Sequence, residues 1–406
     1  MNTRAVNFPL MDSIRAIALV SVVAAHTSFF VALEGTDALT KVRFDFGVRV
    51  FFMISAFLIY RPWVRARMRG YDRPQLHVYA WRRMLRIVPA YWVALTVITI
   101  WLGLVGVFTW TGVPIYYGFG QIYDNVKSVG GLPQAWSLCV EVVFYAMIPV
   151  YAALMRRLPT RDPGRKLRQE LVGPALLFAV GLAYKVFIVK AGTLEDPDLV
   201  VLQLNTLAFI DDFAFGMALA AISVWYEGRD DVARPLQLLD RFPGIAWALG
   251  LIALWVVSTK VGLTGQLGEP VGRRQYIERH FLFSIVALGL VLPAMFGDPR
   301  RGWVRKLLGW RPLLYVGMVS YAVYLYHFAV LLQLDRWGFA DVAKDEWAWL
   351  WFPTAIAGGV LLATLSYYIV ERPALRLKSL VGTKPEPQPG EAIAEPAPVA
   401  PNRVRA

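Results

Sequence analysis

Three long stretches of this chain contain no Asp, Glu, Lys or Arg: residues 87–123, 312–334 and 347–370. Soluble domains carry a charged residue at about one position in four, so uncharged stretches of this length are rare in them. A helix needs about 20 mostly apolar residues to cross a bilayer, and each stretch is long enough. Charged residues make up only 17% of the whole chain. The sequence therefore excludes a water-soluble enzyme and predicts a membrane protein.

Ten segments have the length and apolarity of a membrane-spanning helix. They cover residues 12–34, 45–61, 88–108, 136–155, 171–190, 204–226, 243–259, 280–297, 313–334 and 348–370. Segments of about 20 residues are too long for the strands of a membrane barrel, and these lack the alternation that such strands need. We therefore predict an all-α polytopic membrane protein, a bundle of about ten transmembrane helices.

The net charge of +13 is distributed unevenly between the two sides of this arrangement. With a cytoplasmic N-terminus, the inner segments hold 29 Lys and Arg and the outer segments hold 9. Cytoplasmic loops of membrane proteins carry such an excess, so the bias predicts the orientation. An even number of spans then places both termini in the cytoplasm, for a protein of the inner or plasma membrane.

The C-terminal residues differ in composition from the rest of the chain. Residues 379–406 hold six prolines among Ala, Glu and Gln, a composition that cannot bury enough apolar surface to fold. We predict a transmembrane domain over residues 1–378 and a disordered Pro/Ala-rich cytoplasmic tail over residues 379–406.

Arg15 and His26 stand in the first span, eleven residues apart. Eleven residues make close to three helical turns, so the two side chains share one face and lie about 16 Å apart along the axis. Ionisable groups at membrane depth are costly and indicate functional sites. A neutral histidine in the outer half of the bilayer is suited to general-base catalysis. The alternative is a His26 that only hydrogen-bonds between helices, with Arg15 reaching the inner interface.

The fourth span begins with Trp136 and carries Ser137, Glu141 and Tyr145 at i, i+4 and i+8, one stripe of a helix. Glu141 lies at a depth compatible with contact to His26. A carboxylate beside an imidazole fixes its tautomer and raises its basicity. The alternative is a structural ion pair without chemistry.

Other spans add polar groups. Asp212 in the sixth span and His327 in the ninth fall in the outer half of the bilayer, which predicts a polar cavity there. Tyr321 precedes His327 in a hydroxyl-rich segment, although tyrosines also anchor helices at the interface. Glu371 ends the last span near the inner face, where it either pairs with Arg15 or stays exposed.

The loop between the second and third spans is rich in arginine and contains no lysine. Arg83 and Arg86 are neighbours on a helical face, and Arg82 adjoins them. The planar guanidinium suits phosphate, which predicts a clamp for a phosphorylated cytosolic ligand. Positive-inside topology and anionic membrane lipids give a basic loop in any case, so both interpretations stay open. The chain has no P-loop, zinc signature, dinucleotide motif or nucleophile elbow, and so no indication of nucleotide hydrolysis or metalloprotease chemistry.

Six short motifs run through the chain in a recognisable order. They are Leu10-Met-Asp12-Ser-Ile-Arg15-Ala with His26; Phe51-Phe52-Met-Ile-Ser55-Ala56-Phe57-Leu58; Arg83-x-x-Arg86 with Ile87-Val-Pro89-Ala-Tyr91; Trp136-Ser137-Leu138-Cys-Val-Glu141-Val-Val-Phe144-Tyr145; Ser320-Tyr321-Ala-Val-Tyr324-Leu-Tyr326-His327; and Glu371-Arg372-Pro373. Over residues 8–376 the chain resembles the acyltransferase-3 family of integral membrane acyltransferases, which modify hydroxyl groups on envelope sugars, lipids and some antibiotics. Ala56 stands where the family usually has Gly, which affects only local packing.

The resemblance implies a membrane O-acyltransferase that uses cytoplasmic acyl-CoA, most often acetyl-CoA, and needs no metal or nucleic acid. It implies His26 as the catalytic base, Arg15 as its motif partner and Glu141 as its support, with Arg83 and Arg86 on the CoA phosphates. The expected acceptor is an envelope glycolipid or polysaccharide. Because the esterase-like domain fused to some members is not found here, the acyl group goes to the acceptor directly or to an extracytoplasmic partner protein.

One rival interpretation comes from a different class. A proton-coupled transporter would use His26, Glu141 and Asp212 as a relay. It predicts inverted repeats and broken helices near the midplane, and the sequence shows neither. A purely structural scaffold leaves the buried charges without a purpose.

Overall fold

The computed structural model describes residues 8–33, 42–192, 200–263, 271–343 and 349–381, and the statements below refer to these residues. Within them every regular element is a helix, and no strand occurs. The predicted all-α class is therefore confirmed. Most of the predicted tail, residues 382–406, lies outside the described residues.

Eight long apolar helical segments are able to cross a membrane, and two bent helix pairs raise the number to as many as ten. The eight are built on α1 (Met11–Leu33), α2 (Gly47–Arg69), α3 (Leu76–Leu102), α5 (Trp136–Arg156), α6 (Pro163–Ala191), α8 (Ile210–Tyr226), α11 (Arg273–Met295) and α16 (Trp351–Ser366). The bent pairs are α9 (Arg234–Arg241) with α10 (Gly244–Thr259), at 90°, and α13 (Arg311–Met318) with α14 (Ser320–Arg336), at 75°. Each of the ten predicted spans thus coincides with a helix or a helix pair.

Short elements connect the long helices or extend them. They are α4 (Gly112–Tyr117), η1 (Gln121–Tyr123), η2 (Pro133–Ala135), α7 (Val200–Leu204), η4 (Thr206–Phe209), α12 (Trp303–Leu308), α15 (Phe339–Val342), the π-helical turn η6 (Tyr367–Glu371), α17 (Arg372–Arg376) and η7 (Leu377–Leu380). Single π turns inside longer helices are rare and occur frequently at functional sites.

The ninth predicted span is not one straight helix, as the sequence indicated, but the broken pair α13–α14. Gly317, close to the break, packs directly on the backbone of Asp12 in α1, and a β-carbon there would collide with the Asp12 carbonyl. Only glycine permits this approach, which turns α13 across α1 before α14 begins. Hydropathy carries no information about such a contact, so the break was not predictable from it.

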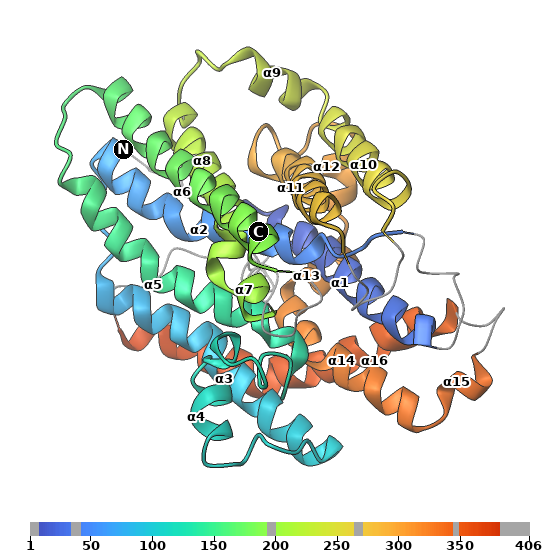
Figure 1. Ribbon diagram of the computed structural model, residues 1–406. Helices are drawn as coiled ribbons and strands as arrows, with labels where there is room; N and C mark the ends of the chain where they lie inside the picture. Colours follow the sequence, from blue (N-terminus) through green and yellow to red (C-terminus); the bar gives the residue numbers. More distant parts are fainter. Residues whose placement is uncertain (1–7, 34–41, 193–199, 264–270, 344–348, 382–406) are drawn as a thin grey trace, which may run out of the picture.

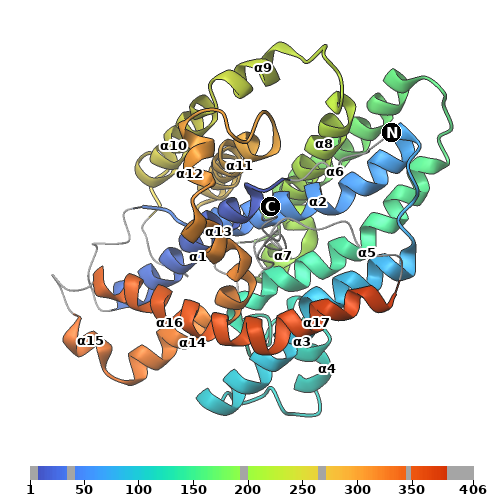
Figure 2. The same ribbon diagram turned by 180° about the vertical axis from the view of Figure 1, so that it is seen from behind.

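The long helices pack side by side, as both views show (Figures 1 and 2), with α2, α5, α6 and α8 in one group and α14 beside α16. Stacked rings of Phe52, Phe213 and Phe144 join α2, α8 and α5, with centroids 4.7 and 4.0 Å apart. The α2–α3 and α5–α6 connections meet at one end of the bundle, where Arg67 donates to the Leu158 carbonyl at 3.1 Å. The α14–α16 connection lies at the opposite end (Figure 1).

Candidate active site

Two histidines from distant parts of the sequence form a pair between α1 and α14. His26 Nδ1 lies 2.8 Å from His327 Nε2, and the rings are stacked with centroids 5.0 Å apart. On its other side, His327 Nδ1 lies 3.1 Å from the Val323 carbonyl oxygen. A carbonyl only accepts hydrogen bonds, so His327 Nδ1 carries a proton and its Nε2 accepts one from His26 Nδ1. This arrangement leaves His26 Nε2 with a free lone pair, the state that a general base requires.

The two histidines differ in accessibility. His327 is fully buried, whereas His26 keeps part of its surface exposed. The edge of Phe328 packs against the His26 ring, with centroids 5.2 Å apart. His26 is therefore the member of the pair that a substrate can reach, and His327 is positioned to orient it.

The predicted stripe of α5 faces the interior and holds a carboxylate with two hydroxyl partners. Ser55 donates to Glu141 Oε1 at 2.6 Å, and Tyr145 donates to Glu141 Oε2 at 2.9 Å. Among the described residues, no hydrogen bond joins Glu141 to His26, the contact that the matching depths predicted. The partner found at His26 is instead His327.

Ser137 stands one turn of α5 before Glu141 and contacts a residue beside the histidine pair. Ser137 lies 2.7 Å from the hydroxyl of Tyr324, whose ring stands beside His327 at a centroid distance of 5.8 Å. Trp136, in contrast, packs among apolar rings, 6.4 Å from Phe52 between ring centroids. The α5 stripe thus meets the histidine pair through a hydroxyl contact and a ring contact of Tyr324, whose own hydroxyl donates to the Gln134 carbonyl.

Arg15 forms a salt bridge with Asp12, three residues earlier in α1, at 2.7 Å, and not with Glu371. The positive charge near Glu141 comes from three arginines, since Arg15, Arg83 and Arg86 all interact with it electrostatically. Arg86 also interacts with Glu371. Arg86 therefore connects the basic α3 segment with the interior carboxylates.

The structure divides the arginines between the second and third spans into two groups. Those of α2 are neutralised by protein groups: Arg65 by Glu227 at 2.9 Å, and Arg67 by Glu170 at 2.7 Å. Arg83 and Arg86 form no salt bridge with a described residue, and Arg82 lies half-buried beside them. The buried Arg83 Nε has no hydrogen-bond partner among the residues that the structure describes. This pair is available for an external anion.

The last predicted span brings Glu371 to the same region. It closes the π-helical turn η6 and is buried, and its Oε1 atom has no hydrogen-bond partner in the described part of the chain. Tyr321 in α14 donates to the Ile87 carbonyl of α3 at 2.8 Å. Both residues therefore support the position of α3, next to Arg83 and Arg86.

Asp212 belongs to a separate polar cluster. It accepts from Arg49 at 2.6 Å and from Ser284 at 2.7 Å, and Arg49 also contacts His280. Lys185 and Asp211 form a second buried pair at 2.6 Å. No hydrogen bond among the described residues links Asp212 to His26 or Glu141. The broken pair α13–α14 has the form that the transporter interpretation predicts.

Several of these functional contacts were not found from the sequence. The roles of Tyr324 and Asp12 as partners were missed, although both lie in the recognised motifs, and so was the Arg49–His280 contact. The Tyr324–Ser137 and Arg49–His280 contacts join distant parts of the chain, and their sequence separations carry no periodic pattern. Asp12 and Arg15, in contrast, are i, i+3 neighbours in α1, a spacing that was visible in the sequence.

A helical bundle with a histidine pair, a buried carboxylate and unpaired arginines defines a polytopic membrane protein with an internal site for polar chemistry. A family model described as an acyltransferase domain matches residues 9–371 of this chain. The chain belongs to this family of acyltransferases. The described residues hold no group of three His, Cys, Asp or Glu side chains arranged for a metal ion.

Curated relatives agree with this assignment. The chain is 23% identical over 379 residues to the peptidoglycan O-acetyltransferase OatA of Listeria monocytogenes, covering 90% of this chain and 55% of that protein. It is 25% identical over 426 residues to the acyltransferase MdmB of Streptomyces mycarofaciens, covering 97% and 98%. With Nodulation protein 10 of Rhizobium leguminosarum bv. viciae, it shares 25% identity over 355 residues, covering 82% and 83%. The chain thus spans only about half the length of OatA, and no solved structure matches it.

Proposed function

We propose that this protein transfers an acyl group, most often acetyl, from cytoplasmic acyl-CoA to a hydroxyl group of a cell-envelope glycolipid or polysaccharide. The observation that carries the proposal is the hydrogen bond between His26 and His327, which leaves the accessible histidine with a free Nε2 lone pair. An O-acyltransferase needs such a base because a sugar hydroxyl is a weak nucleophile until its proton is removed.

In the proposed reaction, His26 Nε2 takes the proton of the acceptor hydroxyl as its oxygen attacks the thioester carbonyl carbon. The carbon–oxygen ester bond forms and the carbon–sulfur bond breaks. The leaving thiolate then receives the proton from the His26 imidazolium, so that CoA leaves as a thiol and the base is restored. His327 holds the ring in place throughout, through its hydrogen bond to Nδ1.

Two arginines of α3 support acyl-CoA as the donor. Arg83 and Arg86 have no salt-bridge partner among the described residues, and the phosphates of an acyl-CoA supply the charge that they lack. Arg82 adjoins them. Acyl-CoA is a cytoplasmic donor, so the arginines that bind its phosphates have to face the cytoplasm. This agrees with the excess of basic residues in the predicted inner loops.

His26 lies in the predicted outer half of an inner or plasma membrane, and this position supports an acceptor that is reached from the outer side. OatA is a peptidoglycan O-acetyltransferase by its name, which supports an envelope acceptor here. A separate extracytoplasmic partner protein is the alternative recipient of the acyl group.

The test uses purified protein with labelled acetyl-CoA and an envelope extract. We expect acylated product from the natural enzyme and a loss of about 100-fold or more for His26→Ala, the usual cost of losing a general base. His77→Ala is the matched control, because His77 is exposed at the beginning of α3. Equal rates for His26→Ala and His77→Ala would reject His26 as the base.

A further inference from the structure

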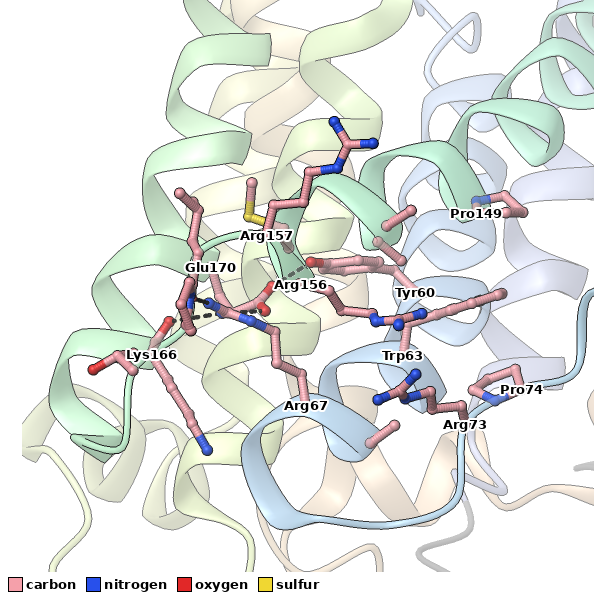
Figure 3. A pocket seen from close by; sticks show the side chains of 17 residues that line it. Tyr60, Trp63, Arg67, Arg73, Pro74, Pro149, Arg156, Arg157, Lys166 and Glu170 are labelled. Carbon is pink, nitrogen blue, oxygen red and sulfur yellow. Dashed lines mark hydrogen bonds and ion pairs between the residues drawn. The ribbon is translucent and has the colours of Figure 1, made fainter.

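A pocket of about 590 Å³ opens where α2, α5 and α6 meet (Figure 3). This volume falls within the range of small-molecule sites. The pocket lies between the α2–α3 and α5–α6 connections, at the end of the bundle that the charge distribution assigns to the cytoplasm. None of the site residues discussed so far lines it except Arg67 and Glu170, which neutralise each other at 2.7 Å.

The remaining charge in the pocket lining is positive. Four basic side chains line it and form no salt bridge with a described residue: Arg73, Arg156, Arg157 and Lys166. Glu170 is the one acidic residue in the lining, and it also accepts a hydrogen bond from Tyr60. An excess of unpaired cations at one pocket attracts a ligand with several negative charges.

The α5 wall of the pocket continues the helix face that carries the site. Glu141, Tyr145, Pro149, Ala152 and Arg156 follow one another at intervals of four, four, three and four residues, which keeps them on one stripe. The last three line the pocket, and the first two hydrogen-bond to each other inside the bundle. Eleven residues separate Tyr145 from Arg156, about 16 Å along the axis.

The other wall leads to the free arginines. Trp63 lines the pocket from α2, and its ring contacts that of Tyr79 in α3, with centroids 5.7 Å apart. The guanidinium of Arg83 lies 6.0 Å from the same Tyr79 ring. Arg83 does not line the pocket; the rings of Trp63 and Tyr79 lie between them.

We infer that this pocket binds the nucleotide end of the acyl donor, with its ribose 3′-phosphate on Arg73 and Arg156 and its base on Trp63, while the diphosphate reaches Arg83 and Arg86. In the view of Figure 3 these three residues lie on the same side of the pocket, away from the Arg67–Glu170 pair. The inference rests on the proposed function, because the long arm of the donor then passes Arg83 and follows the α5 stripe to Glu141. An anionic lipid headgroup offers phosphate as well, but it has no base for Trp63 and no arm for the path inward.

The test is the double variant Arg73→Ala/Arg156→Ala, with Arg165→Ala/Arg168→Ala as the matched control. The two control arginines are exposed on α6 and do not line the pocket. We expect the Kd for CoA to rise about tenfold or more in the pocket variant, the usual effect of losing a charge-assisted contact. The KM for acetyl-CoA should rise with it, while kcat and the rate with acetyl-pantetheine, which has no nucleotide, stay unchanged. The single variant Arg156→Gln, a milder change, should give a smaller rise in the same direction.

Different failures have different meanings. If the natural enzyme does not bind CoA, the proposed function itself fails. If CoA affinity falls in Arg83→Ala/Arg86→Ala but not in the pocket variant, the function stands and this inference is wrong. A lipid site would show itself in nanodiscs: the pocket variant would lose phosphatidylglycerol in native mass spectrometry yet keep its affinity for CoA, and that result also overturns the inference.

Discussion

At the scale of single residues, the proposed chemistry depends on one hydrogen bond between two imidazoles. His327 is fully buried and is tied to the Val323 carbonyl, so it has one orientation in which to accept from His26. A base held in this way populates mainly the productive rotamer and the correct tautomer.

Replacing His327 with Ala removes the acceptor for His26 Nδ1 while leaving the base itself in place. We expect kcat to fall about tenfold to 100-fold with an unchanged KM for acetyl-CoA, because the donor site is not altered. His327→Gln, whose amide carbonyl accepts a hydrogen bond, should recover part of the rate. Steady-state kinetics at saturating acceptor will measure this, and full activity in His327→Ala would contradict a positioning role.

Glu141 accepts hydrogen bonds from both Ser55 and Tyr145. Losing one of these donors removes a single hydrogen bond, whereas losing the carboxylate also removes its charge. Glu141→Gln removes the negative charge near Arg15 and Arg86 and turns an amide NH₂ toward a hydroxyl donor. We expect a loss of at least tenfold in the single-turnover rate, against only a few-fold for Ser55→Ala, which leaves the Tyr145 bond. Equal losses in the two variants would show that the charge has no separate effect.

Residue identities were predictable from the sequence to a larger extent than residue contacts. Arg15, His26 and Glu141 stand out because ionisable groups are rare in apolar spans, and that rarity is visible in one dimension. The partner of His26 was not predictable in the same way. It lies 301 positions away, on α14, the helix that follows α13 after a bend of 75°.

At the scale of elements, small residues decide how closely the helices approach. Gly317 lets α13 rest on the backbone of α1, and Gly216 lets α8 rest on the backbone of α2 at Met53. Close approach of this kind is the usual basis of helix association in membranes, where the lipid offers no hydrophobic driving force. The α1–α13 contact also carries Asp12, the partner of Arg15.

Gly317→Ala should therefore lower the unfolding temperature by several degrees, because the added methyl group forces α13 away from α1. Cys139 is the single cysteine and is buried, so a thiol-reactive dye reports the unfolding directly. Gly309→Ala is the control, since a β-carbon there meets its neighbours no closer than 3.4 Å. Identical melting curves for the two variants would show that the contact does not constrain α13.

The cluster around Asp212 is a structural tie between α2, α8 and α11. Breaking its ion pair from one side, as in Asp212→Asn or Arg49→Met, leaves a buried partner uncompensated, at a cost of about 3–5 kcal/mol. The double variant Arg49→Met/Asp212→Leu removes both charges and should melt above either single variant. The same dye assay measures all three, and a double variant with additive losses would contradict the coupling.

The positions of the helices were predictable because span length and apolarity are set by the bilayer. The bend of α13 against α14 and the π-helical turn at Glu371 were not, since both come from local packing that hydropathy does not record. Those two irregular places lie next to the site, where deviation from regular helix is frequent.

At the scale of the whole molecule, the basic residues assign a direction to the bundle. We expect Arg165→Cys, in the Cys139→Ser background, to be protected from a membrane-impermeant maleimide in intact cells. Val126→Cys, exposed between α3 and α5, should be labelled under the same conditions. Permeabilised cells provide the control, because both cysteines should then react. Labelling of Arg165→Cys in intact cells would show that the bundle has the opposite orientation to the predicted one. The donor would then enter from the other side of the membrane.

The most direct test of transfer across the membrane places donor and acceptor on opposite sides. Proteoliposomes with the predicted inner face toward the lumen are loaded with labelled acetyl-CoA, and an envelope glycolipid or polysaccharide is added outside. We predict labelled O-acyl product in the outer medium for the natural enzyme and none for His26→Ala. Product that forms only when acetyl-CoA is supplied on the same side as the acceptor would contradict the account.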